Sequence, residues 1–211
     1  MGRLESSEFL GENEILLLVE TWLLNELELE SFVGYHQLAK PAEAAGRPSG
    51  GLSIFVAAWI PRFNVVYKDE HCIILENGGV FITACYIQPH YSASEVIDFV
   101  QIMIAHMDLS KPCILGGDLN CRIDPEAPGK KGNYLVEFLE NFGLKLVNDA
   151  ERYTYICEGG CSTIDLYFTN VADVIQCEVQ QVTARRHMPV TISIRVSNLV
   201  TGRPERKAVN F

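Results

Sequence analysis

The sequence contains no long hydrophobic run, since none approaches the roughly 18 apolar residues that a membrane-spanning helix needs. The first eleven residues include charged side chains and no extended apolar block, which is unlike a secretory signal. We therefore expect no membrane contact and an intracellular protein.

A framework of closely spaced, paired cysteines is also missing. The seven cysteines are scattered from Cys72 to Cys177, and an odd, scattered set is typical of free thiols that pack as small hydrophobic side chains. No internal repeat or low-complexity tract is present. With 211 residues, 48% of them hydrophobic, the chain is long enough for one domain with a sizeable core.

Basic residues are scarce. Lys and Arg number 17 against 27 Asp and Glu, which gives a formal net charge of −10. Nonspecific binding to nucleic acid depends on basic side chains that neutralise phosphates, so only local patches could support it. The candidates are Arg185, Arg186 and Arg195, together with Lys130 and Lys131, although solvated surface charge is the simpler interpretation of the two lysines.

Short apolar runs separated by turn residues predict many strands and two helices. Asn77-Gly78-Gly79 predicts a tight hairpin turn. Periodic apolar residues predict helices over 94–107, with Ser94 as N-cap, and over 132–142, ended by Gly143. The predicted strands are 15–19, 52–56, 64–68, 71–75, 80–86, 112–115, 144–147, 164–168, 175–182 and 189–196. This pattern favours an α/β sandwich of two packed mixed sheets with helices outside.

The segment Cys113–Asn120 reads as a buried strand that stops at two glycines and then presents a carboxylate and a carboxamide. Residues two apart in an extended segment point the same way, so we expect Asp118 and Asn120 to face one substrate atom. A carboxylate can hold or deprotonate a water, and an amide can donate to a phosphate oxygen.

Four further polar residues stand at the ends of predicted strands: Glu20, Tyr86, Asp165 and His187. Strand ends meet at one edge of a sheet sandwich, so these residues can share a site with Asp118. Each has a structural alternative. Glu20 could favour a helix start, Tyr86 and His187 could serve packing, and Asp165 could cap a turn.

The ordered motifs resemble the endonuclease/exonuclease/phosphatase superfamily, and among its branches the apurinic-endonuclease-like domain of non-LTR (LINE-type) retrotransposons. The resemblance covers about residues 15–196, so we assign 1–196 to such a domain and 197–211 to a tail or linker. The motifs are ETW at 20–22, GRPSGGLSIFV at 46–56, YIQP at 86–89, GDLN at 117–120, STIDLYFTN at 162–170 and RHMPV at 186–190.

The resemblance implies a four-layered α/β sandwich that cuts phosphodiesters with Mg²⁺ or Mn²⁺. By the same resemblance, Glu20 binds the metal and Tyr86 contacts the scissile phosphate. Asp118 orients or activates water, Asn120 stabilises the phosphate, and His187 pairs with Asp165. DNA is the implied partner, a reverse transcriptase following in a longer polyprotein is a further one, and action on chromosomal DNA implies a nuclear location.

Two features depart from the family pattern. The family begins with a strand that ends in a metal-binding asparagine, and residues 1–14 contain no such strand, so we expect a domain that lacks its first strand. The family also has an aspartate where this chain has Arg186. An arginine a few Å from Mg²⁺ would repel it by about 1–4 kcal/mol at effective dielectrics of 20 to 80. We therefore expect impaired catalysis in the isolated chain.

Three functions remain open from the sequence. The first is a metal-dependent DNA endonuclease from a retrotransposon-derived protein. The second is an inactive descendant that binds nucleic acid or protein. The third is a phosphatase or phosphodiesterase acting on a small molecule or lipid.

Overall fold

The computed structural model describes residues 15–42, 46–123, 130–180 and 186–195. Its centre is a six-stranded mixed sheet whose order is β4-β5-β6-β7-β11-β8. Only β6 and β7 pair in parallel, and the other neighbours are antiparallel. The strands are β4 (Asn64–Lys68), β5 (Cys72–Asn77), β6 (Val80–Tyr86), β7 (Cys113–Asp118), β11 (Asp165–Thr169) and β8 (Lys145–Leu146).

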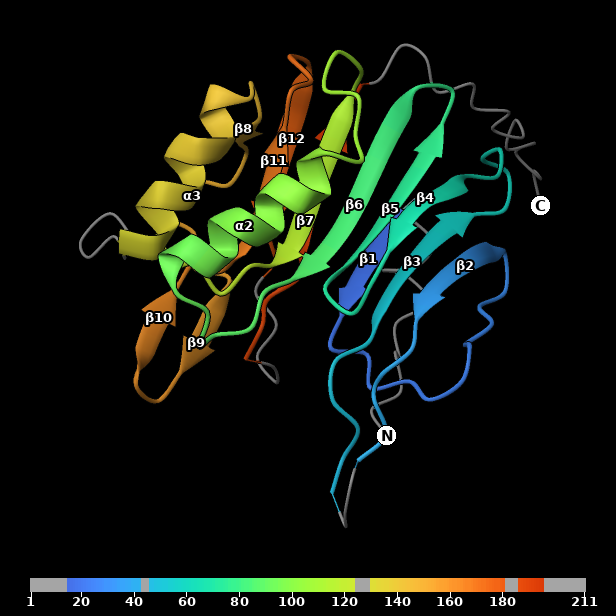
Figure 1. The fold of residues 1–211 in the computed structure, drawn as a ribbon, viewed down its shortest axis with the longest axis horizontal. Helices are drawn as coiled ribbons and strands as arrows, with labels where there is room; N and C mark the ends of the chain where they lie inside the picture. The colour runs from blue at the N-terminus through green and yellow to red at the C-terminus, as the bar shows by residue number, and fades with distance from the viewer. Residues whose placement is uncertain (1–14, 43–45, 124–129, 181–185, 196–211) are drawn as a thin grey trace, which may run out of the picture.

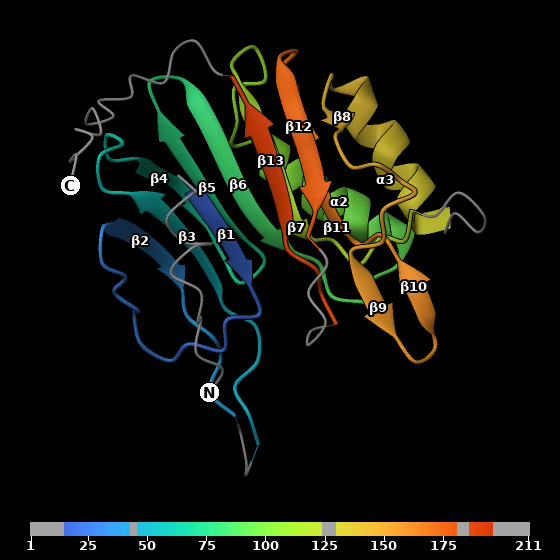
Figure 2. The same cartoon turned by 180° about the vertical axis from the view of Figure 1, so that it is seen from behind.

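A second layer of strands covers one face of this sheet, as Figure 2 shows from behind. It contains an antiparallel sheet of order β1-β3-β2 and the antiparallel pair β12-β13. These strands are β1 (Ile15–Val19), β2 (Phe32–Gln37), β3 (Leu52–Ala57), β12 (Val174–Val179) and β13 (Val190–Ile194). A small hairpin of β9 (Tyr155–Cys157) and β10 (Gly160–Ser162) projects from the lower end of the molecule in Figure 1.

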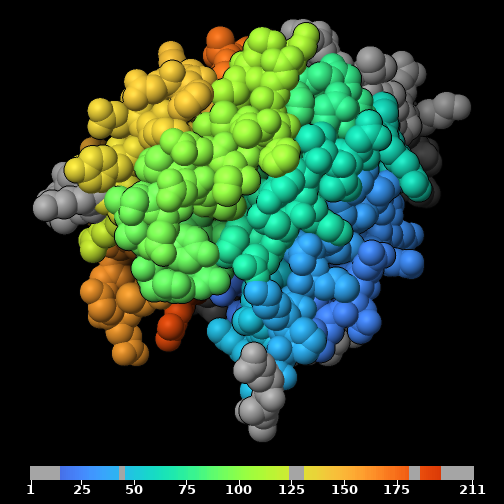
Figure 3. All heavy atoms as spheres, in the orientation of Figure 1, coloured from blue at the N-terminus to red at the C-terminus, as the bar shows by residue number. Residues whose placement is uncertain are grey.

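The helices α2 (Ala93–Ile104) and α3 (Lys130–Asn141) lie together on the opposite face of the central sheet. Figure 3 shows that face filled by atoms, with the green α2 between the yellow α3 on the left and the teal strands β4 and β5 on the right. The predicted α/β sandwich is confirmed: the central sheet is mixed, whereas the described pairs of the second layer are antiparallel. Among the described residues, no helix is long and apolar enough to cross a membrane.

The central sheet is buried on both faces because its strands alternate between two apolar cores. On β5, Ile74 faces the helices, whereas Ile73 and Leu75 face the second strand layer. All three side chains are fully buried. Burial of an Ile or Leu side chain contributes about 1.5–3 kcal/mol, so this two-sided packing holds the central strands, and with them the strand ends, in place.

The N-cap of α2 lies two residues earlier than predicted. Ser92, not Ser94, is the N-cap, and it exchanges hydrogen bonds with Glu95 in a capping box. The prediction of Ser94 was wrong because the box needs a glutamate three residues after the serine, which only Ser92 has. The other helix ends as predicted at Gly143, whose φ of +79° is a left-handed conformation that glycine adopts freely.

The predicted strands 15–19, 64–68 and 80–86 match β1, β4 and β6 residue for residue, and Gly78 and Gly79 form the predicted turn, both with positive φ. The strand β2 and the hairpin β9-β10 were not predicted, because neither has a clear apolar alternation. Three predictions fall outside the described residues: the missing first strand before Ile15, the tail 197–211, and the position of Arg185.

Candidate active site

Glu20 follows the last residue of β1 and lies in a strained turn. Glu20 and Trp22 have φ values of 49° and 52°, a left-handed conformation that is unfavourable for residues other than glycine. Two backbone hydrogen bonds hold the turn, from Thr21 N to Gly51 O at 3.1 Å and from Trp22 N to Gly50 O at 3.0 Å. The segment before β3 therefore fixes the position of Glu20.

A tyrosine joins the two strand layers at this point. Tyr86, the last residue of β6, donates a hydrogen bond from its hydroxyl to Glu20 Oε1 at 2.9 Å. Burial and this hydrogen bond raise the pKa of the Tyr86 hydroxyl, so it remains a donor at neutral pH. The structure thus brings Glu20 and Tyr86 together, as the motifs predicted.

The two glycines before Asp118 are required by close neighbours. A Cβ on Gly116 would lie 2.1 Å from the Tyr167 ring, and a Cβ on Gly117 would lie 1.9 Å from the carbonyl oxygen of Cys85. Gly117 also has a φ of +146°. Glycine at both positions lets β7 pass tightly between β6 and β11, which places the side chain of Asp118 at the end of the strand.

Three predicted site residues lie side by side across the central sheet. Asp118 pairs in register with Tyr86 on β6 and with Asp165 on β11. Figure 1 shows the arrowheads of β1, β6 and β7 at the same end of the molecule. The expectation that distant strand ends meet at one edge is therefore met.

His187 reaches the same edge from the segment before β13. Its Nδ1 lies 3.1 Å from Asp165 Oδ1, and its backbone bridges to Tyr155 of the small hairpin. The hydrogen bond to Asp165 raises the pKa of His187 despite the opposing effect of burial. The predicted pairing of His187 with Asp165 is present.

Asp118 is the most buried of these charged groups, with 3% of its surface exposed. Burial, together with the nearby carboxylates of Asp165 and Glu20, raises its pKa to about 7, although His187 and the backbone N–H of Asn120 act in the opposite direction. An acid that titrates near neutral pH is suited to accept a proton from water.

Asn120 occupies a different geometry from the one expected. It follows the end of β7 with a φ of 47°, so the extended pair with Asp118 does not form. Its backbone N–H donates to Asp118 Oδ1 at 3.1 Å, and its side-chain amide donates to the carbonyl of Ile87 at 2.9 Å. Asn120 therefore holds the Asp118 carboxylate and leaves its own amide oxygen without a described partner.

Two residues that were not predicted position Asp165. Thr154 is fully buried, and its hydroxyl accepts hydrogen bonds from the backbone N–H groups of Ile164 and Asp165, both at 3.0 Å. Asn148 donates to the carbonyl of Asp165 at 3.0 Å and accepts from Tyr167 N. No spacing in the sequence distinguishes them from ordinary loop residues.

The arrangement offers ligands for a divalent cation. One ligand atom each from Asp118, Asp165 and His187 lies within 4.8 Å of the others. Glu20 is close enough to raise the pKa values of both Asp118 and His187. Because Asp165 and Glu20 both raise the pKa of Asp118, the three carboxylates form a site of excess negative charge, and oxygen ligands of this kind suit Mg²⁺. The residues therefore fit a metal. The sequence predicted one metal ligand, Glu20, and the structure places further ligand atoms close together in Asp118, Asp165 and His187.

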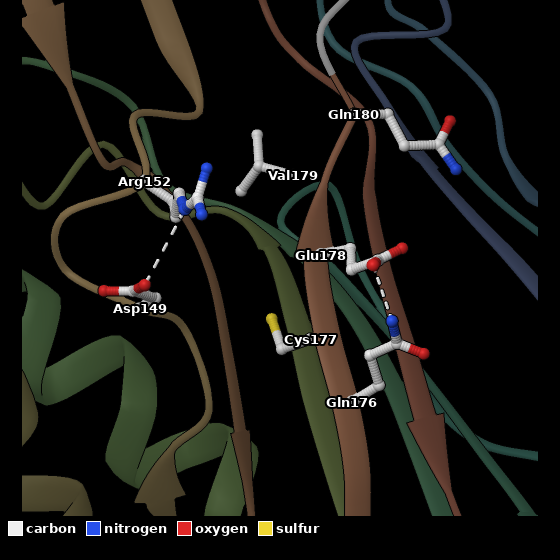
Figure 4. Close-up of a pocket in the computed structure, with 7 residues that line it drawn as sticks. All are labelled: Asp149, Arg152, Gln176, Cys177, Glu178, Val179 and Gln180. Atoms are coloured by element: carbon white, nitrogen blue, oxygen red, sulfur yellow. Dashed lines mark hydrogen bonds and ion pairs between the residues drawn. The ribbon is translucent and has the colours of Figure 1, made fainter.

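A separate hollow of about 510 Å³ lies beside β12. Figure 4 shows its lining, in which Asp149 pairs with Arg152 and Gln176 bonds to Glu178. It shares no lining residue with the strand-end cluster, so it is not the predicted site.

The comparisons with known proteins agree with this geometry. The sequence model of the family described as endonuclease-reverse transcriptase matches residues 80–188, which include Tyr86, Asp118, Asp165 and His187. No curated protein is similar enough in sequence to count as a match.

Several solved structures share the fold at low sequence identity. The endonuclease domain of TRAS1, a telomere-specific non-LTR retrotransposon, is 15% identical with a TM-score of 0.70 over 89% of this chain and 88% of that chain. An AP endonuclease from Archaeoglobus fulgidus is 12% identical with a TM-score of 0.65 over 89% and 91%. The APE2 catalytic domain from Xenopus laevis is 13% identical with a TM-score of 0.65 over 89% and 85%.

The fold and the strand-end cluster define a nuclease or phosphodiesterase type of domain. The chain belongs to the endonuclease-reverse transcriptase family of the endonuclease/exonuclease/phosphatase superfamily, as the motifs indicated.

Proposed function

We propose that this chain is a metal-dependent DNA endonuclease domain of a retrotransposon-derived protein. The observation that carries the proposal is the meeting of Glu20 and Tyr86 with Asp118, Asp165 and His187 at one end of the sandwich. These residues come from separate segments of the chain. A cluster of carboxylates with a histidine can hold a metal and stabilise the charge that develops when a phosphodiester is hydrolysed.

Asp118, Asp165 and His187 bring ligand atoms together and Glu20 lies beside them, so these are the residues that would hold the metal, with Mg²⁺ or Mn²⁺ as the proposed ion. When bound, such an ion supplies positive charge that offsets the charge developing on the phosphate. Arg186 precedes the histidine and is exposed, and its positive charge opposes cation binding, so we propose that the unmodified chain cuts weakly.

The protein groups divide the remaining chemistry. Asp118 accepts the proton of the attacking water as the new oxygen–phosphorus bond forms and the bond to the leaving oxygen breaks. His187 is held through Nδ1 by Asp165, which leaves Nε2 for a phosphate oxygen. Tyr86 keeps Glu20 in place and lies beside Asp118 in register.

The test is nicking of supercoiled plasmid DNA by the purified chain, with Mg²⁺, with Mn²⁺ and with a chelator. We expect slow nicking that requires metal and is lost in Asp118→Asn. The matched control is Asp98→Asn, which makes the same change on the exposed surface of α2 and leaves nicking intact.

The other outcomes separate the alternatives. Binding of DNA with no cleavage in any metal contradicts the enzyme and favours an inactive binding module. Hydrolysis of nucleotides or phosphoinositides without DNA cleavage favours a small-molecule or lipid phosphatase. We propose a nuclear location because the proposed substrate is chromosomal DNA. We propose a reverse transcriptase in the same polyprotein because the matching family is described as endonuclease-reverse transcriptase.

A further inference from the structure

An exposed tryptophan and an arginine stack beside the strand-end site. The guanidinium carbon of Arg47 lies 4.3 Å from the centroid of the Trp22 ring, and 41% of the Trp22 surface is exposed. Trp22 follows Glu20 by two residues, so the stack lies directly beside the proposed metal ligands. Neither residue is used by the proposed chemistry.

The backbone that carries Trp22 adopts an energetically unfavourable conformation. Trp22 and Glu20 both have left-handed φ values, and residues in such conformations concentrate at functional sites. A Cβ on Gly51 would lie 2.6 Å from Thr21 Oγ1, so the two segments fit only with glycine there. That buried hydroxyl has no hydrogen-bond partner among the described residues, which is a second unfavourable feature of the turn.

The charge of Arg47 reaches the site. Burial and Glu20 raise the pKa of the Tyr86 hydroxyl, whereas Arg47 lowers it, so the guanidinium lies within electrostatic range of that hydroxyl. The chain has a net charge of −10, which repels a polyanion such as DNA. A cation such as Arg47 beside the three carboxylates gives the DNA backbone a local group that attracts it. Arginine also binds phosphate through paired N–H donors.

We propose that Trp22 and Arg47 form a DNA contact of the site, in which Arg47 binds a backbone phosphate next to the one that is cut and Trp22 stacks on an unstacked nucleobase. This inference rests on the proposed function, because it assigns the substrate contacts of that same site. Stacking of a base on an aromatic ring tolerates any sequence, so the contact selects distorted DNA rather than a particular base.

The test measures binding of fluorescent duplexes with and without one unpaired base, in the Asp118→Asn background so that the DNA stays intact. We expect Trp22→Ala to weaken binding of the distorted duplex by about 5- to 100-fold and to reduce the preference for it, with little change in salt dependence. We expect Arg47→Ala to weaken both duplexes and to reduce the slope of log affinity against log salt by about one.

The controls make the same changes elsewhere. Arg62→Ala removes an exposed arginine from the loop before β4, at the opposite end of the strands from Tyr86, and Phe142→Ala removes an exposed aromatic after α3. We expect both control variants to keep the DNA affinity, the preference for the distorted duplex and the salt slope of the Asp118→Asn protein. Trp22→Phe and Arg47→Lys retain part of the binding, and urea unfolding of every variant identifies any loss that comes from misfolding.

Plasmid nicking by the native chain is measured in parallel, which separates the two proposals. If the native chain nicks DNA but Trp22→Ala and Arg47→Ala leave the DNA affinity and the salt slope unchanged, the proposed contact is overturned and the endonuclease proposal stands. Binding that depends on both residues, without any nicking, supports the contact and overturns the endonuclease. A chain that neither binds nor nicks DNA overturns both.

Discussion

The hydroxyl of Tyr86 donates to Glu20 Oε1 at 2.9 Å, and this single hydrogen bond joins the end of β6 in the central sheet to the turn after β1 in the second strand layer. A partly buried bond to a carboxylate contributes about 1–2 kcal/mol. It also fixes one proposed metal ligand, so its removal has both a structural and a functional consequence.

Tyr86→Phe removes this bond while keeping the ring. We expect the free energy of unfolding to fall by about 1–2 kcal/mol and the stabilisation by Mg²⁺ to diminish, because Glu20 is no longer oriented. Urea unfolding with and without Mg²⁺ measures both effects. Tyr35→Phe is the matched control, since the Tyr35 hydroxyl bonds to the backbone of Phe63 at the other end of the strands. Equal Mg²⁺ responses in the two variants would contradict the assignment of Glu20.

The stability of the metal-free protein should fall as the pH rises. The pKa of Asp118 is raised from 3.8 to about 7, so its favourable contribution is complete below about pH 4 and is lost as the pH passes 7. His187, whose pKa is raised by Asp165, acts in the same direction above pH 6.5.

The measurement compares urea unfolding of the native chain and Asp118→Asn between pH 4 and 8. One pKa unit corresponds to about 1.4 kcal/mol, so we expect the stability of the native chain relative to the variant to fall by a few kcal/mol across this range. Groups common to both proteins cancel in the difference. A constant difference between the two proteins would show that burial does not raise the pKa of Asp118.

Gly117→Ala tests the tight passage of β7. The new Cβ would meet a backbone carbonyl that cannot move aside, at a φ of +146°, so we expect a loss of about 2–4 kcal/mol and of metal binding. Gly143→Ala also places alanine at a positive φ but meets nothing within 4 Å, so it should cost about 1 kcal/mol. Chemical denaturation that gives equal losses for both variants would rule out the steric explanation.

Arg186→Asp should strengthen metal binding. The change replaces a positive charge beside His187 by a negative one, and we expect the Mg²⁺ concentration for half-maximal nicking to fall about tenfold. Arg62→Asp gives the same change of charge at the far end of the strands and should have no effect. If both variants respond alike, general charge rather than position is responsible.

Much of the site was predictable because the proposed site residues stand where buried strands end. The apolar runs before Glu20 and Asp118 predicted β1 and β7, and the motif order connected them with Asp165 and His187. The sequence could not reveal that Tyr86, Asp118 and Asp165 are neighbours in register, since pairing between distant strands depends on the whole fold.

The features that the sequence did not predict have physical causes. In β2 the polar His36 is buried and bonds to Ser53 Oγ at 2.8 Å, so its burial is set by a tertiary partner and leaves no apolar pattern. Asn120 was expected to continue an extended strand, but the chain turns there to bond with Asp118. The stack of Trp22 on Arg47 joins two segments separated by a whole strand, and no local rule pairs them.

The bridge between His187 and Tyr155, with the pairing of Asp165 to Asp118, has a consequence for biosynthesis. Chain segments that are remote in order must close long loops before these groups meet, and such closures come late in folding. A partly folded chain therefore holds no assembled centre, and on the proposed function a nascent protein would not cut a phosphodiester until the strands that carry Asp118, Asp165 and His187 have docked.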